Sequence, residues 1–286
     1  MPSGRDIRRR IKSVTSTAQI TRAMQMVAAS RMGRAQEAAL TTRPFAQLLY
    51  RIQRHATTHA GDFTHPLLEM RPVRKRAVIL FGTDKGLCGA LNSNLFRLAA
   101  QFDPATTQFI AAGTRAAQFI AATHGQLVAE FTFSDSPRFD EARPIAALAR
   151  DLFVKREVDQ VQVVATRFIN TMTQEPGVFE FLPIGDIKQL DMPGADVAPD
   201  VTEFLFEFSA ADVLGYLFGH YLNIYVYRVM LEAKASEHSA RMVAMKNATD
   251  NATGLIRDLT LGYNHLRQGN ITKEMLEIAG GQLDNN

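Results

Sequence analysis

A glycine-rich loop, Gly82-Thr-Asp-Lys-Gly-Leu-Cys-Gly89, holds the residues whose types and spacing could most readily do chemistry. The apolar run 77–81 before it predicts a buried strand, and 91–102 after it suits a helix. Loops at this place bind phosphates because the first amide groups of a helix lack partners. The spacing matches neither a P-loop nor G-x-G-x-x-G. Two readings therefore stay open: a nucleotide site, and a tight turn that needs its glycines.

Other reactive side chains do not form a set by their spacing. His55 and His59 lie one helical turn apart and could offer two imidazoles to a metal, but no third ligand accompanies them. Asp84 and Lys85 could pair or catalyse, although a solvated turn explains them more simply. The single Cys88 excludes an internal disulfide and fits a reducing compartment.

Alternating apolar runs and amphipathic segments surround the glycine-rich loop. The predicted strands are 77–81, 108–112, 127–131, 160–166 and 178–182. The predicted helices between them are 91–102, 114–124 and 143–154. Such alternation predicts an α/β layer with a mostly parallel sheet. We place this Rossmann-like domain at residues 73–184, between linkers at 55–72 and 185–200.

The segments on either side of this domain have the periodicity of long helices. Residues 209–278 contain no proline, and apolar residues recur there every three or four positions. One continuous helix of this length would measure about 100 Å, and its apolar stripe needs a second helix beside it. Residues 3–43 also lack proline and carry an alanine-rich stripe, with an interruption expected at Pro44.

The fold class that follows is α/β plus a long helical coiled coil. In it the N- and C-terminal helices pair antiparallel around the inserted α/β domain. We assign residues 1–57 to an N-terminal shaft helix and residues 209–286 to a C-terminal shaft helix.

Charge is unevenly distributed along the chain. Residues 1–54 carry eleven Arg or Lys against two acidic residues, a net charge of +9 in a chain whose total is +3. A nucleic-acid arm, a transit peptide and a helix that meets acidic partners all have this signature. The third is favoured, because no aromatics interleave the arginines and the pattern runs too far for a cleavable leader. No run approaches the about 18–20 apolar residues of a membrane span.

Four strings resemble the gamma subunit of F-type ATP synthases, in the right order and across essentially the whole chain. They are Ile20-Thr-Arg-Ala-Met-Gln-Met-Val-Ala-Ala-Ser30, Asp84-Lys-Gly-Leu-Cys-Gly-Ala-Leu-Asn92, Ala235-Ser-Glu-His-Ser-Ala-Arg-Met-Val-Ala-Met-Lys246 and Ile271-Thr-Lys-Glu-Met-Leu-Glu-Ile278. The resemblance implies a rotor shaft inside a ring of three alpha and three beta subunits. It also implies a foot against the epsilon subunit and the membrane c-ring. Catalytic residues, cofactors and metals are not expected, and the glycine-rich loop would be structural.

The resemblance carries contact residues over to this chain. Contacts with the alpha and beta subunits are expected at Arg22, Met24, Arg241, Gln268 and Thr272. Contacts of the foot with the c-ring or the epsilon subunit are expected at Phe204 and Glu207. Nucleic acid and direct membrane insertion are not expected, and the cytoplasmic side of a bacterial plasma membrane is the favoured location.

Two other classes of protein stay open on the residues alone. One is an α/β enzyme or nucleotide-binding protein with a helical dimerisation arm, which would use the loop Gly82–Gly89. The other is a passive coiled-coil scaffold.

Overall fold

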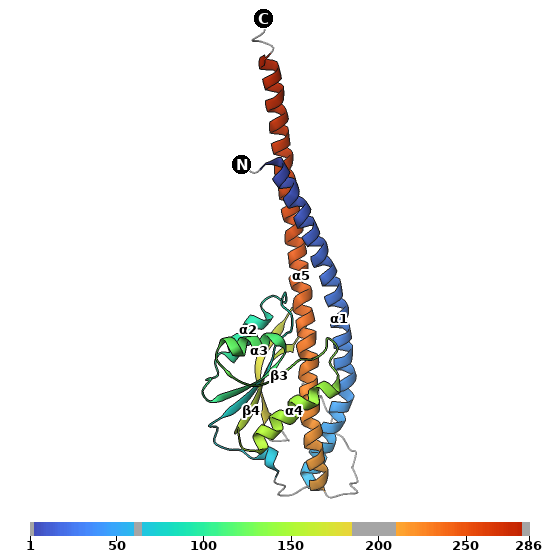
Figure 1. Ribbon diagram of the computed structural model, residues 1–286. Helices are drawn as coiled ribbons and strands as arrows, with labels where there is room; N and C mark the ends of the chain where they lie inside the picture. The colour runs from blue at the N-terminus through green and yellow to red at the C-terminus, as the bar shows by residue number, and fades with distance from the viewer. Residues whose placement is uncertain (1–2, 60–64, 185–209, 282–286) are drawn as a thin grey trace. The chain divides into compact units, whose positions relative to one another are not determined.

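Long terminal helices and one five-stranded sheet make up the computed structural model, which describes residues 3–59, 65–184 and 210–281 (Figure 1). The chain divides into two compact units. The smaller unit comprises residues 1–28 and 242–286, and the larger comprises residues 29–241. Both long helices contribute residues to each unit.

The sheet of the larger unit has the strand order β3-β2-β1-β4-β5. The strands are β1 (Arg76–Phe81), β2 (Thr107–Ala112), β3 (Gln126–Phe131), β4 (Gln160–Phe168) and β5 (Gln174–Leu182). β1 pairs in parallel with β2 and β4, β2 pairs in parallel with β3, and β5 runs antiparallel to β4. The predicted α/β class with a mostly parallel sheet is confirmed, and the strand order is that of Rossmann-like proteins.

Both faces of the sheet are covered, as strands of continuous apolar residues require. The covering helices are α2 (Leu91–Ala99), α3 (Thr114–Ala122), α4 (Phe139–Val154) and residues 210–241 of α5 (Ala210–Gly281). Val78 and Leu80 of β1 pack in one core cluster with α2 and α3. Ala77 and Ile79 pack in the other cluster with α4 and α5. The period of two along β1 thus divides the core between the two faces.

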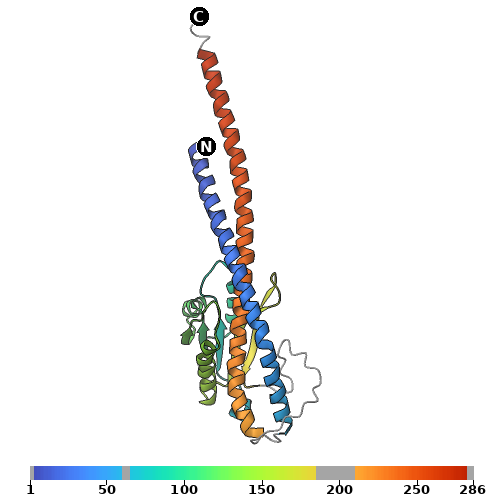
Figure 2. The same ribbon diagram turned by 90° about the vertical axis from the view of Figure 1, so that its right-hand side faces the viewer.

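α5 is part of the sheet's core. Phe218, Leu222 and Met230 are each at most 1% exposed and belong to the cluster shared with α4. Every residue from Ala233 to Ser239 is buried. A helix can bury consecutive residues only when other elements cover it on all sides. Within this unit α1 runs beside α5 on the side away from the sheet, as both views show (Figures 1 and 2).

In the smaller unit α1 (Gly4–His59) and α5 pair antiparallel. Arg8 donates to the Tyr263 hydroxyl, and the hydroxyls of Thr21 and Thr249 lie 2.7 Å apart. Residue numbers therefore fall along α5 as they rise along α1, which confirms the predicted antiparallel pairing. The buried residues of this seam include Ile7, Ala28, Met245 and Ala252.

Three predictions of where an element breaks or ends were wrong. The interruption expected at Pro44 does not occur, and α1 continues to His59, past the start of the linker predicted at 55–72, because a proline removes one hydrogen bond of the ladder and a helix can continue past it. α4 begins at Phe139 rather than at 143, because Glu141 accepts the Arg138 backbone N–H at 2.7 Å and caps the first turn.

The third boundary is that of β5, which begins at Gln174 rather than at 178. The Asn170 side chain accepts the backbone N–H groups of Met172 and Thr173, each at 2.9 Å, and so closes a tight hairpin after β4. The second predicted linker, 185–200, lies outside the described residues.

Gly113 allows the loops after β1 and β2 to approach each other. Its φ is +104°, and a Cβ there would lie 2.4 Å from the carbonyl oxygen of Gly82. We expect Gly113→Ala to lower the free energy of unfolding by about 2–4 kcal/mol, because a backbone atom must move. Urea denaturation of the full chain, followed by circular dichroism, measures this.

The matched control is Gly33→Ala on α1, where nothing lies within 4 Å of the added Cβ. It should raise the free energy of unfolding by about 0.5–1 kcal/mol, since alanine is the better helix former. Equal midpoints for the two variants would contradict the close approach at Gly113.

Candidate functional site

The glycine-rich loop Gly82–Gly89 follows β1 at its carboxyl end, between β1 and α2. Strand order reverses beside it, because β2 and β4 lie on opposite sides of β1. Proteins with such sheets bind ligands in the crevice at this switch point. Leu87 and Gly89 take left-handed conformations, with φ of 63° and 60°. The loop is therefore where a nucleotide site would be sought.

Helix α5 fills this crevice with buried polar side chains. The Lys234 ammonium is 3.1 Å from Glu237 and 3.4 Å from Asp84 of the loop. The Ser236 hydroxyl donates to the carbonyl of Thr166 at the end of β4, at 3.3 Å. Lys234, Ser236 and Glu237 are each at most 3% exposed. Side chains of the chain itself thus occupy the space above β1 and β4.

The cavity that the described residues leave in this crevice is too small for a nucleotide. A cavity of about 10 Å³ lies among residues that include Gly82, Asn92, Thr166 and Glu237. Pockets for organic ligands measure about 300–1,000 Å³, whereas a single water needs about 10–15 Å³. The Glu237 carboxylate would also repel a phosphate. The crevice is thus closed as it stands.

Arg241 fastens the loop from outside. Its guanidinium donates to the carbonyls of Lys85 and Gly86, each at 3.2 Å, and to Glu237 at 2.8 Å. The side chain is only 11% exposed. A carbonyl-rich side of the loop therefore faces a cation, which is the reverse of an anion-binding nest of N–H groups.

Asp84 connects the loop to α3 and α5, and both of its carboxylate oxygens are engaged in these contacts. Its Oδ1 accepts the backbone N–H of Thr114 at 3.1 Å, which caps the first turn of α3. Its Oδ2 pairs with Lys234. Lys85, the other residue of the loop considered for catalysis, is exposed.

Two titratable groups are buried beside this network. Burial lowers the pKa of His238 below 6.5, and its ring nitrogens have no hydrogen-bond partner within the described part of the chain. Burial likewise raises the pKa of the Cys88 thiol, which favours the unreactive protonated form. Within the described residues no three His, Cys, Asp or Glu side chains gather to hold a metal. The side chains of His55 and His59 lie outside the described ones.

The predicted partner-contact residues are divided between the two units. In the smaller unit Arg22 is exposed and Met24 half-buried on α1, while Gln268 and Thr272 are exposed on α5. The Thr272 hydroxyl donates to the Gln268 carbonyl at 3.0 Å, so these two occupy successive turns of one helix face.

Arg241 belongs to the larger unit, where Glu237 holds it. Phe204 and Glu207, the predicted foot contacts, lie outside the described residues. All seven contacts stay predictions.

Sequence reasoning missed the network around Lys234. The available signal is the set of charges Lys234, Glu237 and Arg241 among small residues such as Ala233, Ala235 and Ser236. Small neighbours allow other backbones to approach closely on every side, which marks charges within such a run as candidates for burial.

Together these features define a class of protein: paired terminal helices with a Rossmann-like insert whose ligand crevice is filled by the chain's own helix. A family model described as ATP synthase matches residues 3–283. An ATP synthase gamma chain of Opitutus terrae is 44% identical over 99% of both chains. Another, from Methylacidiphilum infernorum, is 40% identical over 99% of both. The chain belongs to the ATP synthase gamma chain family, which confirms the resemblance.

Solved structures share the fold. The rotor of the Euglena gracilis mitochondrial ATP synthase is similar with a TM-score of 0.65 and 21% identity, over 94% of this chain and 98% of that one. The central stalk of the Tetrahymena thermophila enzyme gives 0.58 and 23%, over 80% and 99%. In the part of the chain that the structure describes, none of the helices combines the length and apolarity needed to cross a membrane.

Replacing Lys234 tests how far the fold depends on its buried charge. We expect Lys234→Met to lower the free energy of unfolding by about 3 kcal/mol, because Asp84 and Glu237 lose their shared cation. Chemical denaturation of the full chain measures the change. Lys246→Met is the matched control, since Lys246 is exposed and should have little effect. An equal, small loss in both would show that Lys234 contributes no more than a surface lysine.

His238 should make stability depend on pH. Because its pKa is lower in the folded state than in the unfolded chain, the unfolded chain binds more protons below pH 6.5. The free energy of unfolding should therefore fall as the pH drops below 6.5, by at most about 1.4 kcal/mol per pH unit, and stay constant above it. Denaturation midpoints at pH 5.5 and 7.5 measure this dependence, which His238→Leu should reduce. An unchanged dependence in the variant would exclude His238 as its origin.

Proposed function

We propose that the chain is the non-catalytic rotor subunit of an F-type ATP synthase. It couples proton flow through a membrane c-ring to ATP synthesis or hydrolysis in a hexamer of alpha and beta subunits. The observation that carries this proposal is the match to ATP synthase gamma chains over residues 3–283. The antiparallel pairing of the terminal helices supports it, because a rotor needs a stiff asymmetric shaft.

The absence of a catalytic role for the glycine-rich loop is part of the proposal. Lys234 and Glu237 occupy the place that phosphates take in related folds, and Arg241 binds the loop's carbonyls. The loop then serves to join α5 to the sheet. An α/β nucleotide-binding protein would need this crevice open.

The proposed mechanism is mechanical. Residues 1–57 and 209–286 would form the shaft, and residues 73–184 the foot against the epsilon subunit and the c-ring. As the shaft turns, it presents different side chains to three otherwise equivalent catalytic sites. Each site then shifts among its conformations because its contacts with the shaft differ.

Contacts between shaft and hexamer are assigned by side-chain chemistry. Exposed Gln268 and Thr272 would exchange hydrogen bonds with the alpha and beta subunits, and Arg22 would pair with acidic segments. Met24 would provide an apolar contact that favours no particular rotational angle of the shaft within the hexamer. Arg241 would meet a partner only while Glu237 fixes its orientation.

The foot and the location complete the proposal. Phe204 and Glu207 are assigned to the c-ring or epsilon contact. The complex would lie at a bacterial plasma membrane, with this chain peripheral on the cytoplasmic side.

Co-purification tests the proposal directly. The chain is tagged in its own host, membranes are solubilised gently, and the proteins that come down are identified. We expect alpha and beta subunits at a ratio of three of each per tagged chain. A lone soluble oligomer without ATPase partners would overturn the assignment.

Met24→Lys should impair coupling. A lysine at this half-buried position can form ion pairs with carboxylates of the partners, and such pairs hold particular rotational angles. We expect proton pumping per ATP hydrolysed to fall severalfold in membrane vesicles, with ATP hydrolysis retained. Gln101→Lys adds the same charge at an exposed position after α2 and should leave the ratio unchanged. Normal pumping in Met24→Lys would refute the role of this residue.

A further inference from the structure

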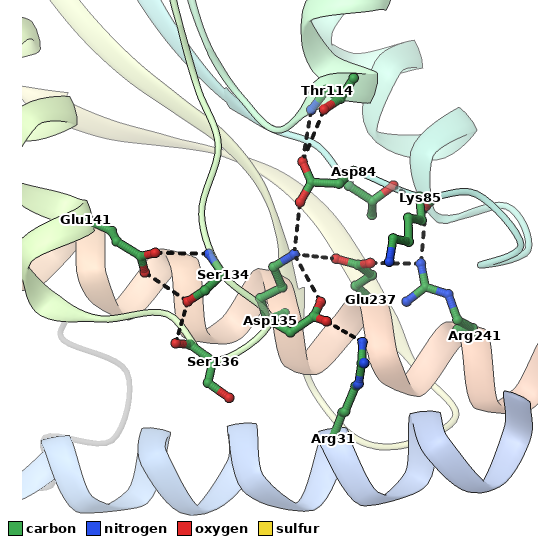
Figure 3. A network of polar contacts seen from close by, with 12 residues as sticks. Arg31, Asp84, Lys85, Thr114, Ser134, Asp135, Ser136, Glu141, Glu237 and Arg241 are labelled. Carbon is green, nitrogen blue, oxygen red and sulfur yellow. Dashed lines mark hydrogen bonds and ion pairs between the residues drawn. The ribbon is translucent and has the colours of Figure 1, made fainter.

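The loop between β3 and α4 reaches both long helices of the larger unit. Asp135 of this loop pairs with Arg31 of α1, and its other oxygen is 3.9 Å from the Lys234 ammonium of α5 (Figure 3). One carboxylate therefore lies between cations of two helices that are far apart in the sequence. All three residues belong to the same compact unit.

The loop that carries Asp135 is itself held in place. The Ser134 backbone N–H and hydroxyl both donate to Glu141 of α4, each at 3.1 Å. The Ser134 hydroxyl also lies 2.6 Å from the carbonyl of Ser136 and closes the turn. Glu141 is fixed in turn because it caps its own helix through Arg138. The loop is therefore fixed to the start of α4, and this places the Asp135 side chain between α5 and α1.

The two helices are attached to the α/β domain by different means. α5 is anchored through buried apolar side chains such as Phe218 and Met230. Buried positions of α1 in the described part of this unit include Ala35, a small side chain. Alanine contacts let a helix come close, but they resist sliding and twisting weakly because they are short and non-directional. Over residues 29–38, where the structure describes the side chains of α1 in this unit, a directional contact adds the resistance to rotation that Ala35 does not supply.

We propose that Arg31 and Asp135 form a torsional latch, in which they are positioning residues that make α1 turn together with α5 and the α/β domain. The inference rests on the proposed rotor function. A charge-assisted hydrogen bond is directional and resists rotation of α1 about its own axis. The Lys234 ammonium of α5 lies 3.9 Å from the other oxygen of the Asp135 carboxylate, so that the latch also involves α5.

The side chains of the latch are more exposed than those of an ion pair that stabilises the fold. The side chains of Arg31 and Asp135 are 35% and 42% exposed, whereas that of Lys234 is 2% exposed. Ion pairs of such exposure contribute little to folding free energy and weaken in salt. Removing the latch should therefore change the stiffness of the shaft much more than its melting temperature.

The experiment uses the chain assembled with alpha and beta subunits and fixed to a surface through the hexamer. A bead attached to the α/β domain at Gln101→Cys, in a Cys88→Ser background, reports angular fluctuations in the arrested complex. We expect Arg31→Gln and Asp135→Asn each to raise the angular variance about twofold, with a change in melting temperature below about 3 °C. Arg31→Lys keeps the cation and should restore the original variance.

Two controls separate the latch from general effects of charge. Asp140→Asn removes another exposed carboxylate of the same region, one that pairs with Arg138 two positions before it, and should leave the variance unchanged. Raising the salt to about 0.5 M should raise the variance of the unaltered chain much more than that of Arg31→Gln, because only the former has the Arg31–Asp135 pair to screen.

Hydrogen exchange gives a second readout that needs no rotation. In the full chain, amides of residues 29–38 should exchange about threefold faster in Arg31→Gln than in the unaltered chain. If the chain does not assemble with alpha and beta subunits, the rotor function fails while exchange still tests the latch. Unchanged variance and unchanged exchange in both variants would overturn the latch.

Discussion

The arrangement of the loops around α5 depends on the buried ammonium group of Lys234, which lies among carboxylates. Desolvating a charge costs several kcal/mol, so Lys234 can be enclosed only if partners reach it from every side. Glu237 comes from its own helix, while Asp84 and Asp135 come from loops after β1 and β3. The ring of Phe133 adds its face at 4.7 Å. The loops at the carboxyl end of the sheet therefore have the shapes that bring these groups to one helix.

Because Lys234 must be enclosed, the crevice in which related folds bind ligands holds a packing contact between the sheet and α5. Rossmann-like sheets keep the crevice beside the first strand open for a phosphate, but here α5 passes through it. Gly82 lets the loop pass close to α3, where an added Cβ would lie 2.9 Å from the Ala116 backbone nitrogen, and Arg241 of α5 binds the loop's carbonyls. A feature that resembles a site thereby serves as the connection between the sheet and a long helix. α5 has two packing roles, as sheet-covering helix in one unit and as partner of α1 in both.

Periodicity predicted most of the fold because the spacing of apolar residues shows whether an element buries one face or both. The spacing of three and four residues between apolar side chains from Met245 to Leu266 predicted the long helix, and the apolar runs predicted all five strands. Ends were less predictable. The start of α4 depends on Glu141 reaching back to Arg138, and the hairpin before β5 depends on Asn170. These are hydrogen bonds of single side chains, which leave no periodic signal.

The sequence by itself determined the class, because the spacing of apolar residues states which faces must be buried, and the four family strings identify the relatives. It left open whether the glycine-rich loop binds a nucleotide. Only the tertiary structure decided that Lys234 to Ser239 are buried, since Asp84 lies 150 residues away in the chain. Lysine, glutamate and histidine are rarely buried, so residue type alone places them at the surface, and their small neighbours indicate only that burial is possible. Their burial follows from partners that the fold alone brings together, and local sequence carries no record of such distant charge pairing.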